Sequence, residues 1–120
     1  MCIRDSTTPY DLVRLASYAM TIPLFAQIVR TQHYSLAVTS SHHSYTWDNT
    51  NLLLATYAGA TGIKTGFTFE AGECLVFSAT RSGHHLLGVV FHSIDATHRF
   101  SDARTLLNWG FALPLLPPTP

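Results

Sequence analysis

Three consecutive β-strands are predicted in the second half of the sequence, and they constrain the fold more than any other feature. Residues 63–69, 73–80 and 85–92 are rich in apolar and β-branched residues, and polar or glycine-containing segments separate them. Gly83, within residues 81–84, suits a tight hairpin turn. The last two strands are mostly apolar on both faces. A strand of this kind must be covered on both faces, so the sheet has to be buried on both sides.

Two helices are predicted before the strands. Thr8-Pro9-Tyr10-Asp11 supplies a capping hydroxyl, a proline for the first helical position and an acidic residue for the positive helix end. Apolar residues then recur at helical spacing on one face, at Leu12, Leu15, Ala16 and Ala19. Pro23 interrupts this helix and starts a second one, which we expect to end near Arg30. The residues that we expect the second helix to bury are Leu24, Phe25 and Ile28.

A final helix is predicted from about Thr97 to Trp109, with Gly110 placed to end it. Its expected inner face consists of Phe100, Ala103, Leu106 and Leu107. A short capped helix is predicted directly after Asn49-Thr50-Asn51. Residues 31–50 fit either a weak hairpin or a long surface loop, and the sequence leaves this open. These elements predict an α+β fold: helices followed by a small antiparallel sheet with a C-terminal helix packed on it.

The composition excludes several classes of function. Seven basic and seven acidic residues give a net charge of +0, which argues against nucleic acid and against an anionic membrane surface as partners. The hydrophobic content of 47% excludes intrinsic disorder. No apolar run approaches the roughly 20 residues that span a bilayer, and the first residues do not resemble a signal peptide. Cys2 and Cys74 cannot form a disulfide framework, and we expect Cys74 to be a buried free thiol.

The seven histidines suggest a structural zinc site as one alternative. Two pairs are adjacent in the sequence, His42-His43 and His84-His85. No pair has the i, i+4 helical spacing or a companion CxxC pair, and His85 and His92 would face opposite sides of one regular strand. We therefore expect neither a metal ion nor a cofactor.

The segment from Gly62 to Thr68 contains Lys64-Thr65-Gly66, and Lys64 is the only lysine of the chain. An ammonium group attracts a substrate carboxylate, a threonine hydroxyl can donate to it, and glycine lets an extended peptide approach the strand. The amide of Phe67 can point toward a developing oxyanion. Lys-Thr-Gly on a strand is one of the three elements of penicillin-recognising serine enzymes. The alternative interpretation is an edge strand with one solvated lysine.

The order of four sequence blocks resembles the D-alanyl-D-alanine carboxypeptidases of the low-molecular-mass penicillin-binding proteins, serine peptidase family S11. The blocks lie within residues 6–20, 49–53, 62–76 and 98–111. The resemblance implies that Lys64 is catalytic through its charge and that Thr65, Gly66, Phe67 and Arg99 bind substrate. The Phe67 amide would be half of the oxyanion hole, and Arg99 would hold the terminal carboxylate of the substrate. The alternative for Arg99 is a surface arginine near a helix start, where the helix dipole disfavours positive charge.

The resemblance also implies a function and a place in the cell. The fold would be part of the β-lactamase/transpeptidase-like fold, and the full-length enzyme would remove the terminal D-alanine from peptidoglycan stem peptides through an acyl-enzyme serine. Its ligands would be stem peptides ending in D-Ala-D-Ala and β-lactams, in the periplasmic or other extracytoplasmic cell-wall space. The alternatives are the transpeptidase or penicillin-hydrolase branch of the superfamily, and a non-catalytic fragment that binds peptidoglycan or β-lactam.

Two motifs of the family are absent from the sequence. Thr61 stands where the serine of Ser-x-x-Lys would precede Lys64, and no asparagine follows a serine at the Ser-x-Asn spacing. We therefore expect residues 6–112 to be the C-terminal part of a catalytic domain, inactive alone, whose partner is the missing N-terminal half. Residues 1–5 are expected to be an artefact of library construction or gene prediction, and residues 113–120 a Pro-rich tail. The low charge predicts an uncharged surface that packs against the missing half.

Overall fold

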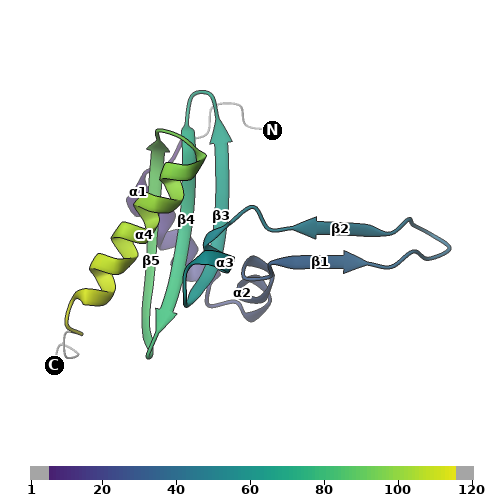
Figure 1. Cartoon of the computed structure of the whole chain (residues 1–120), viewed down its shortest axis with the longest axis horizontal. Coiled ribbons are helices and arrows are strands. Elements are labelled where there is room, and N and C mark those ends of the chain that lie inside the picture. The colour runs from purple at the N-terminus through teal and green to yellow at the C-terminus, as the bar shows by residue number, and fades with distance from the viewer. Residues whose placement is uncertain (1–5, 116–120) are drawn as a thin grey trace.

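The computed structural model describes residues 6–115, so the expected artefact at residues 1–5, the thiol of Cys2 and residues 116–120 lie outside the described residues. The strands are antiparallel and form two separate sheets, β1-β2 and β3-β4-β5 (Figure 1). In chain order the elements are α1 (Pro9–Ala19), α2 (Pro23–Val29), β1 (His33–Leu36), β2 (Tyr45–Asp48), α3 (Leu53–Thr56), β3 (Ala60–Thr68), β4 (Gly72–Arg81), β5 (His84–Ser93) and α4 (Ala96–Ala112).

The three-stranded sheet confirms the strands predicted from the second half of the sequence. β4 and β5 are joined by Ser82-Gly83, and both residues have positive φ, 49° and 75°. This is the backbone of a type I′ turn, whose twist matches that of the flanking strands. Gly88 of β5 lies opposite Phe77 of β4, and a Cβ atom there would be 2.4 Å from Cζ of that ring. A side chain at this position would therefore clash with the Phe77 ring unless the ring shifted.

Both faces of the sheet are covered by helices, as the strands require. On one face, α3 and α4 bury a core that includes Leu53, Leu75, Phe77, Ala79, Phe100, Ala103 and Leu107. On the other face, α1 and α2 pack against the sheet around a smaller cluster of Ala16, Ile63 and Val76 (Figure 1). The α+β prediction, with a C-terminal helix packed on the sheet, is therefore confirmed.

The start of α1 follows the predicted capping chemistry, whereas the N-cap residue of α3, Leu52, makes no side-chain capping hydrogen bond. The hydroxyl of Thr8 accepts a hydrogen bond from the amide of Asp11 at 3.1 Å, and Pro9 is the first residue of α1. The carboxylate of Asp95 caps α4 by accepting from the amide of His98 at 2.7 Å. No described helix is long and apolar enough to cross a bilayer alone; α1 and α2 reach that length only together, with a bend of 113° between them.

The prediction that Gly110 ends the last helix is wrong, because α4 continues to Ala112. Gly110 is buried, and a Cβ atom there would lie 2.7 Å from Cδ1 of Leu86 on β5. The glycine allows close packing of the helix on the strand. A local pattern cannot distinguish this role from helix termination, because both require the absence of a side chain.

Three residues that we expected to be buried are exposed. Leu24 and Ile28 of α2 are 64% and 61% exposed, and Leu106 of α4 is 44% exposed. Phe25 is partly buried against the sheet, so α2 has a second apolar side that no described residue covers. Periodicity predicts which residues share a face, but it does not show what lies against that face.

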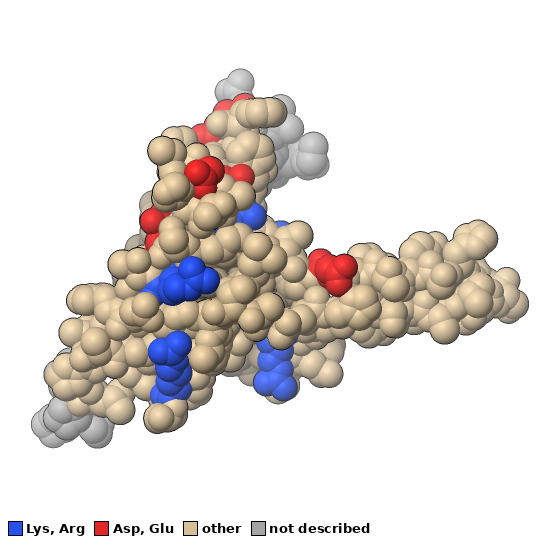
Figure 2. All heavy atoms as spheres, viewed as in Figure 1, with Lys and Arg blue, Asp and Glu red and all other residues tan. Residues whose placement is uncertain are grey.

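Residues 31–50, which the sequence left open, form a hairpin that projects from the rest of the molecule (Figure 1). We call residues 33–48 the aromatic arm, because the cross-strand pairs Tyr34–Trp47 and Leu36–Tyr45 place three aromatic rings on one face. The ring centroid of Trp47 lies 6.0 Å from that of Tyr34 and 5.6 Å from that of Tyr45. Figure 2 shows how little charge the arm carries, and Asp48 is its only Asp, Glu, Lys or Arg.

Candidate active site

The Lys-Thr-Gly segment lies on β3, at the edge of the three-stranded sheet. Within residues 6–115, β3 pairs with β4 on one side and has no strand on the other. Lys64 is exposed, and its Nζ donates a hydrogen bond to the carbonyl oxygen of Thr65. A Cβ atom at Gly66 would meet no atom within 4 Å. The edge therefore offers a charged group and open space to an incoming extended chain.

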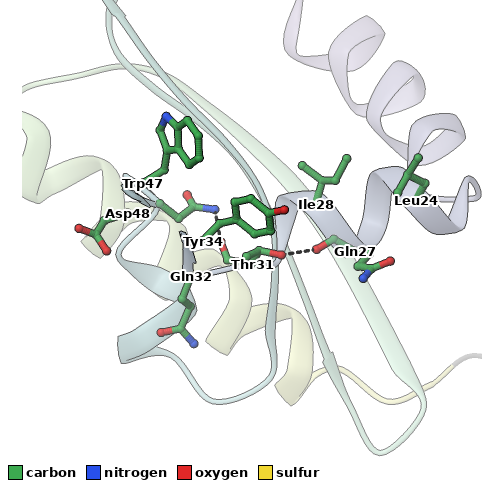
Figure 3. Close-up of a pocket in the computed structure, with 9 residues that line it drawn as sticks. Leu24, Gln27, Ile28, Thr31, Gln32, Tyr34, Trp47 and Asp48 are labelled. Carbon is green, nitrogen blue, oxygen red and sulfur yellow. Dashed lines mark hydrogen bonds between the residues drawn. The ribbon is translucent and has the colours of Figure 1, made fainter. Parts of the chain in front are cut away.

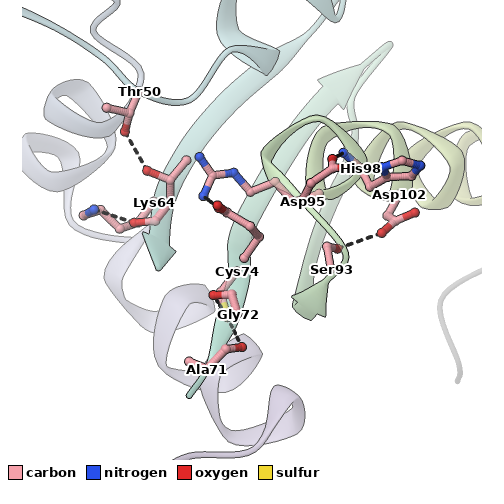
Figure 4. A network of polar contacts seen from close by, with 12 residues as sticks. Thr50, Lys64, Ala71, Gly72, Cys74, Ser93, Asp95, His98 and Asp102 are labelled. Atoms are coloured by element: carbon pink, nitrogen blue, oxygen red, sulfur yellow. Dashed lines mark hydrogen bonds and ion pairs between the residues drawn. The ribbon is translucent and has the colours of Figure 1, made fainter. Parts of the chain in front are cut away.

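Thr65 is held in place by a residue that the sequence analysis did not assign to the site. Thr65 is 7% exposed, and its hydroxyl lies 2.6 Å from the hydroxyl of Thr50 (Figure 4). Thr50 belongs to the Asn49-Thr50-Asn51 turn, where the amide of Asn51 donates to Oδ1 of Asn49 at 2.9 Å. The Nδ2 of Asn49 donates to the carbonyl of Thr31 at 2.9 Å, which ties the turn to the end of α2. This turn was identified as the start of a helix, and it also positions Thr50 against Thr65.

A groove of about 450 Å³ runs along the Lys-Thr-Gly segment on the α1 side of the sheet. Its lining includes Lys64, Thr65, Gly66 and Cys74, together with apolar residues of α1 such as Leu15 and Ala16. Cys74, the partner of Gly66 in the β3–β4 register, is a free thiol as predicted, but it is only partly buried.

Arg99 does not lie on the surface as an ordinary helix-start arginine would. Its side chain is only 12% exposed, and Nη1 donates to Oε2 of Glu73 on β4, whose side chain is 18% exposed. The Nε of Arg99 is buried and has no hydrogen-bond partner within the described part of the chain. Glu73 pairs with Phe67 across the β3–β4 ladder, so Arg99 is anchored beside the strand that carries Lys64. Glu73 is not among the site residues predicted from the sequence.

Phe67, which follows the Lys-Thr-Gly segment, has a side chain that is 55% exposed. Its ring packs edge to face on Phe69, with centroids 5.6 Å apart. The residues assigned to substrate binding from the sequence therefore lie in two places. Lys64, Thr65, Gly66 and Phe67 are consecutive on the open edge, and Arg99 reaches the same strand pair from α4.

Asp95 and His98 form a second polar pair at the start of α4 (Figure 4). The hydrogen bond from the amide of His98, followed by the bond from its imidazole, holds the pKa of the Asp95 carboxyl below its ordinary value of 3.8. This pair caps the helix that carries Arg99.

The groove of about 600 Å³ between α2 and the aromatic arm contains none of the predicted site residues (Figure 3). Leu24, Ile28, Tyr34 and Trp47 line it, with a polar rim that includes Gln32 and Asp48. Within residues 6–115, no three His, Cys, Asp or Glu residues come together as metal ligands would.

An edge strand with Lys-Thr-Gly, covered by helices on both faces, is typical of the penicillin-recognising serine enzymes. Residues 4–95 match the model of peptidase family S11, described as D-alanyl-D-alanine carboxypeptidase. The chain therefore belongs to the S11 family of D-alanyl-D-alanine carboxypeptidases.

Among its relatives, the D-alanyl-D-alanine carboxypeptidase of Streptomyces sp. strain K15 is 43% identical over 89% of this chain, and DacB2 of Mycobacterium tuberculosis is 35% identical over 90%. The crystal structure of the Streptomyces K15 DD-transpeptidase superposes with a TM-score of 0.84 at 45% identity, over 89% of this chain and 42% of that chain. The Listeria monocytogenes penicillin-binding protein D2, in its cefotaxime-bound form, has a TM-score of 0.74 at 32% identity, over 84% of this chain and 39% of that chain. The fold is thus part of the β-lactamase/transpeptidase-like fold. The chain spans 38% of the length of each of the two curated relatives.

Proposed function

We propose that this chain is the carboxylate-docking part of a serine-type D-alanyl-D-alanine carboxypeptidase that acts on peptidoglycan stem peptides in the extracytoplasmic cell-wall space. The observation that carries the proposal is the open edge of β3, where Lys64 is exposed and the space beside Gly66 is empty. Membership in family S11 supports the reaction class. The cefotaxime-bound state of the Listeria relative supports β-lactams as ligands.

Each residue has a distinct role in this proposal. The Lys64 ammonium group and the Arg99 guanidinium group attract the terminal carboxylate of the stem peptide. If the Thr50 hydroxyl donates to Thr65, the Thr65 proton is free to hydrogen-bond that carboxylate. Gly66 leaves room for the peptide backbone, and the Phe67 amide donates to the oxyanion.

The chemical step requires a serine that this chain does not supply in a Ser-x-x-Lys motif. The serine Oγ attacks the carbonyl carbon of the penultimate D-alanine, the bond to the terminal D-alanine nitrogen breaks, and the leaving amine takes a proton. Water then hydrolyses the acyl-enzyme and releases the shortened peptide. We propose that the serine comes from a segment outside these 120 residues, because the relatives are more than twice as long as the matched part.

A transpeptidase is the second candidate, because the solved Streptomyces K15 relative is named a DD-transpeptidase. The two activities share the acyl-enzyme and differ in whether water or an amine attacks it. A non-catalytic fragment that only binds peptidoglycan or β-lactam is the third candidate.

Labelling with a fluorescent penicillin tests the proposal. We expect no covalent adduct with the 120-residue chain alone. We expect an adduct when the chain follows the segment that precedes the matched region in the Streptomyces K15 relative. In this chimera, Lys64→Ala should abolish labelling, whereas Arg14→Ala, which removes an exposed positive charge from α1, should leave it unchanged.

A stable adduct on the chain alone would contradict the proposed origin of the serine. Normal labelling of the Lys64→Ala chimera would remove Lys64 from the site. Adding an amine acceptor to a reaction with a stem peptide ending in D-Ala-D-Ala separates the carboxypeptidase from the transpeptidase. A transpeptidase forms mainly the transfer product, and a carboxypeptidase forms mainly the hydrolysis product.

A further inference from the structure

The ion pair between Arg99 and Glu73 is more enclosed than its place at a helix start suggests. The two side chains are 12% and 18% exposed, and the Arg99 Cζ lies 5.0 Å from the centroid of the Phe100 ring. The bond to Glu73 is the only hydrogen bond that the guanidinium makes within residues 6–115. Glu73 is therefore the group that fixes the direction of the Arg99 side chain.

Glu73 lies on the face of the sheet that also carries Thr65. The β3–β4 register pairs Thr65 with Leu75 and Phe67 with Glu73, and directly paired residues share a face. Leu75 is fully buried in the core under α4, so this face is the one that α4 covers. Residues two apart on a strand share a face and lie about 7 Å apart. Glu73, which lies opposite Phe67, therefore anchors Arg99 close to Thr65, the next residue of β3 on the same face.

The start of α4 does not itself favour a positive charge. Arg99 lies in the first turns of the helix, four residues after the N-cap Asp95, where the helix dipole repels a guanidinium. Without the carboxylate of Glu73, the long side chain would lose its only hydrogen-bond partner within residues 6–115 and would be free to turn toward solvent. The carboxylate offsets the repulsion and keeps the charge beside β3.

We propose that Glu73 is a positioning residue that holds the Arg99 guanidinium toward the Lys-Thr-Gly strand, so that Arg99 can bind the terminal carboxylate of the substrate. This inference rests on the proposed function. It makes Glu73 a determinant of the preference for a free carboxylate, acting through Arg99 without touching the substrate.

The kinetic test compares two peptides in the chimera described above: one ends in D-Ala-D-Ala with a free carboxylate, and the other has its terminal carboxylate amidated. Glu73→Ala should raise KM for the free acid by about 10- to 100-fold, with little change in kcat and little change for the amide. Glu73→Gln keeps an oxygen that accepts from Nη1, and it should restore most of the preference. Glu70→Ala, in the exposed β3–β4 turn, removes the same charge and should behave as wild type.

Two results would overturn the inference. If Glu73→Ala keeps the wild-type preference for the free acid over the amide, the ion pair serves only stability. If Glu73→Ala and Glu73→Gln both lower KM for the free acid, Glu73 competes with the substrate for Arg99.

An NMR measurement on the 120-residue chain alone is independent of activity. The N–H signals of the Arg99 guanidinium, assigned through Arg99→Lys, should be separate from one another in wild type and should merge in Glu73→Ala. No change in these signals would also overturn the inference. If penicillin does not label the chimera, the proposed function fails, and the NMR result still decides whether Glu73 holds Arg99.

Discussion

Replacing Gly66 by alanine separates the function of the strand edge from its stability. The change adds one methyl group where the structure has no atom within 4 Å. Because Ala is favoured over Gly in a strand, the free energy of unfolding should rise by about 0.5–1 kcal/mol. The same methyl enters the space that we assign to the ligand backbone, so acylation should slow by about 10- to 100-fold.

Gly88→Ala is the matched control, with the opposite expectation. Its new Cβ would lie 2.4 Å and 2.6 Å from two ring atoms of Phe77, a side chain that is only 2% exposed and has little room to move. Overpacking of this kind costs about 1–3 kcal/mol. The acylation rate per folded molecule should stay at the wild-type value, because β4 lies between β3 and β5, the strand that carries Gly88.

The assay combines urea unfolding with the rate of labelling by fluorescent penicillin in the chimera, normalised to the folded fraction. Wild-type labelling of a Gly66→Ala protein that is at least as stable as wild type would refute the placement of the ligand beside Gly66. A loss of stability in Gly66→Ala would instead refute the open space at that position.

Three further predictions follow from the contacts of the site and of the exposed apolar surface. Thr50→Val removes the 2.6 Å bond to Thr65, so it should slow labelling and cost about 0.5–1.5 kcal/mol in urea unfolding; unchanged labelling would show that Thr65 needs no support. Asp95→Ala should lower Tm at pH 7. Because folding lowers the pKa of the Asp95 carboxyl, the Tm difference between variant and wild type should shrink as the pH falls through the lowered pKa of the folded protein. A Tm difference that does not depend on pH would contradict this. The chain alone should bind a hydrophobic dye between α2 and the aromatic arm, and the signal should fall in Ile28→Gln; a soluble monomer that binds no dye would contradict the exposure of this surface.

The elements that the sequence predicted well are those whose determinants are local. The start of α1 depends on Thr8 and Pro9, and the β4–β5 hairpin depends on Ser82-Gly83. In both cases a few adjacent residues specify the backbone, so the prediction needs no knowledge of distant contacts.

The errors arise where a residue's role depends on what lies opposite it in the fold. Gly110 was interpreted as a helix end because its contact with Leu86, a residue 24 positions earlier, is invisible in the local pattern. Leu24 and Ile28 were expected to be buried, but they are exposed. Periodicity identifies an apolar face of a helix without showing which residues pack against it. The aromatic arm stayed undecided because each of its strands has only four residues and is exposed along its whole length, so no buried face produces a clear alternating pattern.

The candidate site shows the same division. Lys64, Thr65, Gly66 and Phe67 were assigned together because they are adjacent in the sequence. Thr50 and Glu73, which support the site residues, lie 15 and 26 residues from their partners, and only the fold brings them together.

The open edge of β3 has a consequence for how the chain behaves at high concentration. An unpaired edge strand can hydrogen-bond a second copy of itself as readily as a peptide, and proteins often discourage this with a lysine on the edge. Lys64 is the only charged residue of β3. The ammonium group proposed to attract substrate is thus also the one charge that opposes pairing of two such edges, so a neutral residue there should favour self-association.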